Sequence, residues 1–350
     1  MTTELYPYDQ FGEETAFNTQ EDKQHETTWL IKDIIKPELP ALIDKVEECL
    51  SILDNNQISR MPITSGATTD ATNTTQIQGI ITRQGLYILD IQFTLRFAQY
   101  RKGKLMQFTI GESTTSQTHR TERFAIPQLH AAHEKLLEIL QLLENLELVD
   151  DDTLFVEMFG KALVATSQMN NMLHSPPNEL NFPLDNNCLL KHFFGDKYDY
   201  LCESIHHIVS LEAVICGDEI ILDFRNLDKV IKRPWCNVDK QSGKSVVDTI
   251  RELQKKERNM SLQDILHENN IEVEEQNLLN SFMQNTFNKE STTLQQAQFF
   301  ISRCVTFDGI VVTEQEKVST RCSDGLLVSL ARKLDEVEKS IGNHFANLSV

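Results

Sequence analysis

Long apolar stretches and a secretory leader are both missing from this sequence. No uninterrupted apolar run approaches the ~20 residues needed to cross a bilayer. The N-terminus MTTELYPYDQ lacks the basic start and apolar centre of a secretory signal. The seven cysteines are odd in number, widely spaced and without a CxxC pair, which does not suit a disulfide framework. These absences predict a cytoplasmic protein of a reducing compartment, with no direct insertion into a membrane.

The common motifs of enzymes are absent too. The sequence has no GxSxG, no GxGxxG and no aspartate-rich calcium loop. The segment VDKQSGKS ends like a phosphate loop, but Val238 stands where that loop needs a glycine, five residues before Gly243. The pair His206-His207 lies in a strand-like run, where neighbouring side chains point to opposite faces. We therefore expect no catalytic residues, no cofactor and no bound metal.

Positive charge is scarce. Aspartate and glutamate total 52 against 33 lysines and arginines, which gives a formal net charge of −19. Such a surface repels phosphate backbones and anionic lipid head groups. The excess of negative charge predicts no nucleic-acid binding and favours a basic protein as the partner.

The segment LHAAHEKLLEILQLLENL, residues 129–146, raises the question of a metal or acid–base site, since it contains His130, His133 and Glu134. A zinc-protease helix needs two histidines four apart with a glutamate between them; here the spacing is three and the glutamate follows. Two heptad positions are apolar throughout the segment, as expected of a packing seam. They are Leu129, Ala132, Leu136, Ile139, Leu143 and Leu146. We interpret the helix as a strut, and bound metal in the purified protein would contradict that.

Three further segments repeat apolar residues at intervals of three and four, the period of an amphipathic helix. The first helix begins near Thr27–Trp29, and Pro37 and Pro40 are expected to kink or restart it. The apolar residues that repeat in the three segments form one row each: Leu39, Leu42, Val46, Cys49 and Leu53; Phe155, Met158, Ala162, Ala165, Met169 and Met172; and Leu327, Leu330, Leu334, Val337, Ile341 and Leu348. With the segment at 129–146, these predict one elongated, zipper-like four-helix bundle.

Between the helices the period changes to two, which is typical of strands. IQGIITRQGLYILDIQFTLRF predicts a hairpin at Gln84-Gly85, and a turn at Gly103 leads to a third strand. Gly217-Asp218 and Asp308-Gly309 each separate two β-rich runs, a strong hairpin signal. Residues 255–298 are polar and predict a loosely attached helical excursion.

We thus expect an α+β protein. Its α-helical domain would comprise residues 27–56, 120–175 and 322–350. An inserted antiparallel β-domain would comprise residues 57–119 and 176–321. Residues 1–26 predict a flexible acidic tail. Within that tail Tyr6, Tyr8 and Phe11 form an aromatic cluster that is a candidate for docking into a partner's groove; the alternative is a plain tail.

The order of these elements resembles that of the Rogdi family, whose fungal members are the small subunit of the RAVE complex. The likeness rests on EDKQHETTWLIKDIIKPELPALIDKVEECL, IQGIITRQGLYILDIQFTLRF, the helices at 125–173, NFPLDNNCLLKHFF and the final helix. It covers most of residues 20–350 and rests on order and pattern rather than on one short motif. The long tail and the excursion depart from the compact animal-type members.

The resemblance implies a non-catalytic protein that promotes reassembly of the vacuolar proton-pumping ATPase, the V-ATPase, from its peripheral and membrane sectors. The implied partners are a large propeller-bearing scaffold subunit, a small F-box adaptor and peripheral-sector subunits of the pump. The protein would be recruited through them to the vacuolar or endosomal membrane. The alternative is a generic cytosolic adaptor in trafficking with no role in the pump.

Overall fold

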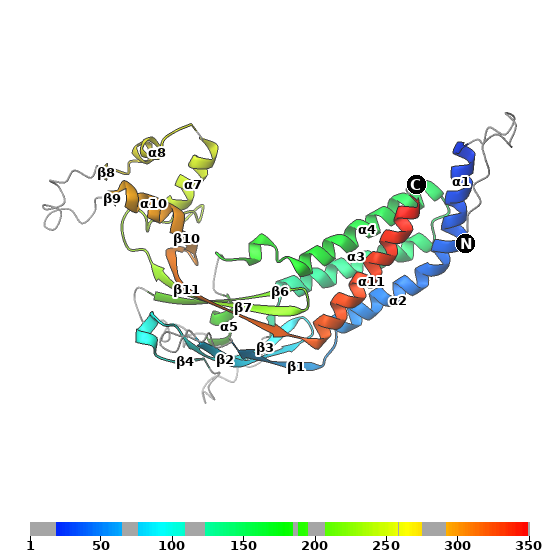
Figure 1. Ribbon diagram of the computed structural model, residues 1–350, viewed down its shortest axis with the longest axis horizontal. Helices are drawn as coiled ribbons and strands as arrows, with labels where there is room; N and C mark the ends of the chain where they lie inside the picture. The colour runs from blue at the N-terminus through cyan, green and yellow to red at the C-terminus, as the bar shows by residue number, and fades with distance from the viewer. Residues whose placement is uncertain are drawn as a thin grey trace, which may run out of the picture. The chain divides into compact units, whose positions relative to one another are not determined.

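The computed structural model describes residues 19–64, 76–108, 123–184, 188–194, 207–257, 259–274 and 292–348 (Figure 1). Within these ranges the chain divides into two compact units. Unit 1 takes residues 19–54, 131–171 and 329–348, and unit 2 takes residues 55–130 and 172–328. Helices and antiparallel sheets are both present, which confirms the predicted α+β class. No helix within the described ranges is both long and apolar enough to span a membrane.

Unit 1 begins with three consecutive helical segments, α1 (Thr19–Trp29), the π-helix η2 (Leu30–Ile35) and α2 (Lys36–Leu53). Helix α1 starts upstream of the predicted position, so part of the expected tail is helical; residues 1–18 lie outside the described residues. Pro37 lies in the first turn of α2 and Pro40 inside it. The backbone stays helical where the π-helix gives way to α2, so a change of helix type precedes Pro37, whereas Pro40 does not end the helix. All five apolar positions predicted for this helix are buried.

The remaining long helices are α3 (Pro127–Glu147), α4 (Asp152–His174) and α11 (Gly325–Leu348). All six seam positions predicted in α3 are fully buried. In α4 the prediction was partly wrong: Met158 and Met172 are half-buried, and the neighbouring Phe159 and Leu173 are buried instead. In α11 the predicted row is buried except for Leu348, which is half-buried.

Polar contacts accompany the apolar rows of unit 1. Lys333 of α11 pairs with Glu48 of α2, and His344 Nε2 lies 2.9 Å from Glu38 Oε2. Gly160 of α4 approaches Phe345 so closely that an added Cβ would lie 3.0 Å from its ring. Helices α2 and α4 therefore both pack against α11.

Unit 2 contains two antiparallel sheets (Figure 1). The first has the order β1-β2-β3-β4, with β5 also paired to β3, and the second has the order β10-β11-β7-β6. The strands of the first are β1 (Ile58–Thr64), β2 (Gln76–Gln84), β3 (Tyr87–Arg96), β4 (Met106–Phe108) and β5 (Phe124–Ala125). Those of the second are β6 (His207–Cys216), β7 (Glu219–Lys229), β10 (Cys304–Phe307) and β11 (Ile310–Ser323). The four predicted turns are confirmed, whereas β1 was not predicted.

Aromatic side chains join the two sheets. The Phe93 ring of β3 lies 4.4 Å from Phe108 and 4.7 Å from Phe224 of β7, measured between ring centroids. Phe194 of the short helix α5 (Cys188–Phe194) adds a third ring contact to Phe93, edge-on at 6.0 Å. Each buried aromatic ring contributes ~1.5–3 kcal/mol by its removal from water, so this cluster is the centre of the β core.

Unit 2 also buries polar groups, each with partners. Arg83 and Asp324 are both 1% exposed, and Arg83 Nε lies 2.5 Å from Asp324 Oδ2. Asp324 Oδ1 also accepts from Leu326 N at 2.9 Å, so the carboxylate begins α11 as well. The buried Gln128 amide donates to the carbonyls of Met172 and Ile215 and accepts from Ile215 N. These groups replace hydration by direct hydrogen bonds.

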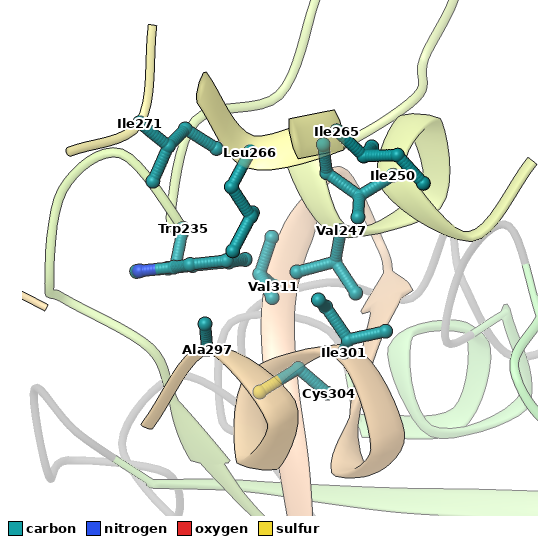
Figure 2. Packing of buried hydrophobic residues seen from close by; sticks show 10 residues of the cluster. All are labelled: Trp235, Val247, Ile250, Ile265, Leu266, Ile271, Ala297, Ile301, Cys304 and Val311. Atoms are coloured by element: carbon teal, nitrogen blue, oxygen red, sulfur yellow. The ribbon is translucent and has the colours of Figure 1, made fainter. Parts of the chain in front are cut away.

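A helical lobe lies between β7 and β10 in the chain, and it includes two helices that begin within the predicted excursion, residues 255–298. It contains α7 (Val246–Lys256), α8 (Leu262–Glu268) and α10 (Leu294–Arg303), with the short parallel strands β8 (Val273–Glu274) and β9 (Thr292–Thr293). The lobe has a hydrophobic core of its own. In Figure 2 side chains from α7, α8, α10 and β11 point toward one another around Trp235, which is fully buried. The sequence did not predict this core, because the segment is polar on average and only one face of each short helix is apolar.

Candidate partner-binding surfaces

The imidazoles of α3 occupy structural positions. The His130 ring lies edge-on to Tyr87 at 5.2 Å, and His133 Nε2 lies 3.2 Å from Asp54 Oδ1. Glu134 is exposed. The two rings thus have different neighbours, and no group of three or more His, Cys, Asp or Glu side chains in the described part of the chain is placed to hold a metal ion. The arrangement suits a strut better than a metal or acid–base site.

The buried thiols are poor candidates for nucleophiles. Burial raises the pKa of Cys49 to about 12, and it raises the pKa of both Cys304 and Cys322 to about 11. Since the thiolate is the reactive form, these three side chains are neutral thiols near pH 7.

The segment that resembles a phosphate loop is used for folding. Ser245 begins α7: its Oγ accepts from Asp248 N at 3.2 Å, and its own N–H donates to Asp248 Oδ2 at 3.0 Å. Burial acts to raise the pKa of Asp248, but hydrogen bonds from Thr306 and Ser245 and the charge of Arg251 lower it below the ordinary value. Lys244 Nζ lies 2.6 Å from Glu252 Oε1. The lysine and serine that a phosphate would need are therefore already engaged.

The predicted docking residues Tyr6, Tyr8 and Phe11 lie outside the described residues. His206 does so as well, whereas His207 begins β6 and pairs with Asp228.

Three exposed apolar side chains that the sequence did not reveal lie at or near the α3–α4 turn of unit 1. We call this group the apolar tip and define it as Trp29, Leu148 and Leu154, which are 52%, 82% and 45% exposed. Two contacts bring the end of α1 and the start of α2 to this turn: Thr28 Oγ1 donates to Asp152 Oδ2 at 2.5 Å, and Lys36 Nζ donates to the Val149 carbonyl at 2.6 Å.

Acidic residues border the apolar tip. Asp150 is exposed and lies 3.9 Å from Lys36, at the edge of ion-pair distance. Asp151 Oδ1 accepts from Leu154 N at 2.7 Å and so caps α4. Tryptophan is enriched among the residues that contribute most to protein interfaces. The exposed apolar side chains and the neighbouring aspartates together fit a partner segment with apolar and basic side chains.

The lobe presents a smaller exposed pair. Ile231 is 69% exposed and Phe299 is 52% exposed, while the adjacent Phe300 stacks on Trp235 at 5.2 Å. Helix α10, which carries Phe299, is thus joined to the core around Trp235 through Phe300.

Comparison with known proteins gives consistent results. The profile of the family described as "Rogdi leucine zipper containing protein" matches residues 26–349. The chain is also 38% identical over 351 residues to a Saccharomyces cerevisiae protein named "Regulator of V-ATPase in vacuolar membrane protein 2". That alignment covers 99% of this chain and 97% of the relative.

Proposed function

This chain belongs to the Rogdi family, and from that premise we propose that it is the small, non-catalytic subunit of a RAVE-type complex that regulates the V-ATPase. The observation that carries the proposal is the similarity to a V-ATPase regulator over almost the full length of both chains. The geometry supports a binding role, because the imidazoles, the buried thiols and the GKS segment are engaged in holding the fold.

The proposed action is to promote reassembly of the peripheral catalytic sector with the membrane sector. A factor of this kind acts by binding the competent arrangement better than the separated one, since a ligand shifts an equilibrium only by its differential affinity. The partners would be the large propeller-bearing scaffold subunit, the small F-box adaptor and peripheral-sector subunits. These partners would recruit the protein from the cytoplasm to the vacuolar or endosomal membrane.

The proposed structural basis is a zipper-like bundle of α2, α3, α4 and α11. Buried rows on all four helices support it. Interlocking of such rows gives a stiff body, and a stiff body loses little conformational entropy when it binds. The apolar tip of this unit is the surface that we assign to a basic, apolar partner segment. Tyr6, Tyr8 and Phe11 remain a separate docking proposal.

The function is tested by removing the protein from its cells. We expect both pump sectors to be present but separated, with weaker recovery of the peripheral sector on membranes and a less acidic vacuole. Re-expression of the chain should restore both measurements. Normal sector association without the protein would contradict the proposal, and a pull-down without pump and scaffold subunits would favour the generic adaptor.

The apolar tip is tested by the double variant Trp29→Ala, Leu148→Ala in the full chain. We expect reduced co-purification of partner subunits with an unchanged melting temperature, because both side chains are largely exposed. Val164→Ala is the matched control, since Val164 is 56% exposed on α4 of the same unit. Equal recovery of partners with both variants would remove the tip from the interface.

A further inference from the structure

A cluster of positive charge lies in the connection between β3 and β4 of unit 2. Between Ile91 and Phe108 the sequence has no aspartate or glutamate, although the chain as a whole has a net charge of −19. Four cationic residues occupy the same stretch, and we call them the cationic turn: Arg96, Arg101, Lys102 and Lys104. The connection contains the 3-10 segment η3 (Tyr100–Gly103).

The backbone of this turn adopts a conformation that costs energy. Arg101, Lys102 and Gly103 have φ values of 47°, 58° and 70°, so three consecutive residues are left-handed. Glycine adopts this region freely, whereas other L-residues do so at a cost. Non-glycine residues in such regions gather at binding and active sites, where the surrounding structure holds them. Two long cationic side chains are thus displayed at positions where glycine would be more stable.

The charges of the turn are incompletely neutralised. Lys102 and Lys104 are exposed, and neither forms an ion pair with any residue that the structure describes. Arg96 packs under the turn, because a Cβ added to Gly103 would lie 3.4 Å from both Arg96 Nε and Nη2. Arg96 Nε is buried and has no hydrogen-bond partner among the described residues. A buried donor without an acceptor costs ~1–3 kcal/mol, which adds to the energetic cost of holding this turn.

Two neighbouring features indicate which acceptor fits. Gln99 N donates to both carboxylate oxygens of Glu316 at 3.1 Å, so one carboxylate already binds at the start of this turn. Leu105, which directly follows Lys104, is 61% exposed. A ligand with carboxylates beside an apolar side chain matches both, and the planar guanidinium of arginine suits carboxylates well.

We propose that the cationic turn binds an acidic segment of a partner protein, with its carboxylates at Lys102 and Lys104 and an apolar side chain on Leu105. The inference deepens the proposed function, on which it rests, by giving the chemistry of one partner contact. A protein segment is favoured over an anionic membrane because a chain of net charge −19 is repelled by a broad anionic surface. A single acidic segment meets only the local cationic field.

The test measures binding of a fluorescein-labelled peptide of glutamate and leucine to the purified full chain by fluorescence anisotropy. We expect the double variant Lys102→Gln, Lys104→Gln to weaken binding about fivefold, as for the loss of two exposed ion pairs. The control Lys255→Gln, Lys256→Gln removes the same charge from exposed lysines at the end of α7. It should leave the affinity unchanged. Equal loss in both double variants would overturn the proposal, because binding would then follow net charge alone.

A second variant separates loss of peptide binding from loss of stability. Lys102→Gly relieves the left-handed backbone at that position, so we expect a higher melting temperature together with weaker peptide binding. Unchanged peptide binding in this variant would contradict the assigned site. Vesicles of phosphatidylcholine and phosphatidylserine provide the other arm: binding to vesicles but not to the peptide would replace the protein partner by a lipid surface. These assays use only the purified chain with a peptide or vesicles. A negative result would therefore count against the cationic turn alone. Failure of the proposed function would appear separately, as normal sector association in cells that lack the protein.

Discussion

The helical unit and the β-rich unit bury their polar groups to different extents. In unit 1 the buried positions of α2, of α3 from Ala131 onward and of α11 are apolar side chains and one cysteine, whereas α4 also buries the polar residues Thr166 and Asn170. Unit 2 buries ion pairs, including Arg225 with Glu212 inside the second sheet and Arg83 of β2 with Asp324, which follows β11. In unit 1, whether a residue is buried therefore depends mainly on the size of its apolar side chain and on its position in the helical period. Burial in unit 2 depends also on finding the correct partner.

The Arg225 group shows what the second kind of burial requires. Arg225 is held by Glu212, by Asp223 at 3.1 Å and by Glu314 at 2.8 Å, and its guanidinium stacks over the ring of Phe182. Burial lowers the pKa of Arg225 from its ordinary value, while Glu314 acts to raise it. Several partners are needed because the cost of removing one charge from water is several kcal/mol. Four variants test the contrast between the units, from the largest expected effect to the smallest.

The largest effect is expected from Asp324→Ala in unit 2. The change leaves the Arg83 guanidinium buried without its counterion, and breaking such a pair costs about 3–5 kcal/mol of unfolding free energy. Urea unfolding of the full chain measures it. The double variant Arg83→Met, Asp324→Asn should lose less, because it removes the unpaired charge and keeps a cap for α11. An equal loss in both variants would show that the ion pair is not the cause.

The second-largest effect is expected from a substitution that creates a cavity in unit 1. Leu136→Ala should lower the unfolding free energy by about 2–5 kcal/mol, because Leu136 is fully buried in α3. The matched control is the next residue, since Leu137 is 47% exposed and Leu137→Ala should change stability by less than about 0.5 kcal/mol. Similar losses at both positions would contradict the assigned face of α3.

Overpacking of unit 1 is expected to cost less than the cavity. Ala162 is fully buried in α4, so Ala162→Leu should cost about 1–3 kcal/mol as side chains leave their preferred rotamers. Val164→Leu, at an exposed position of the same helix, should be close to neutral. A stabilising Ala162→Leu would reveal an empty space at this position.

The smallest effect is expected at the start of α7 in the lobe. Ser245→Ala removes the side-chain cap and should cost about 1 kcal/mol. Ser302→Ala on α10 is the control, because Ser302 is exposed and caps no helix. The measurement is again urea unfolding, and a loss as large as that of Leu136→Ala would mean that the cap supports the whole lobe.

The sequence predicted some elements well and others poorly, for identifiable reasons. The seam of α3 was predicted because each of its positions repeats at helical spacing. Strand β1 was missed because Pro62 interrupts a short run; proline is tolerated there because β1 is an edge strand of its sheet. The row of α4 was misplaced by one residue at Met158 and Met172, because spacings of three and of four fit a helix equally well.

The surfaces were the hardest to predict. The apolar tip depends on residues of α1 and of the α3–α4 turn, which are far apart in the sequence and are joined by Thr28 and Asp152. The cationic turn was visible as a run of lysine and arginine, but its left-handed backbone and the unpaired Arg96 Nε were not.

By itself the sequence determined which helix faces are apolar and where the hairpins turn. Those properties depend on residues close together in the chain, through side-chain period and the φ values that glycine allows. Only the tertiary structure decided which charges pair, which apolar side chains stay exposed and that the lobe has a core. Each of these depends on segments distant in sequence, such as Arg83 and Asp324, whose contact no local pattern encodes.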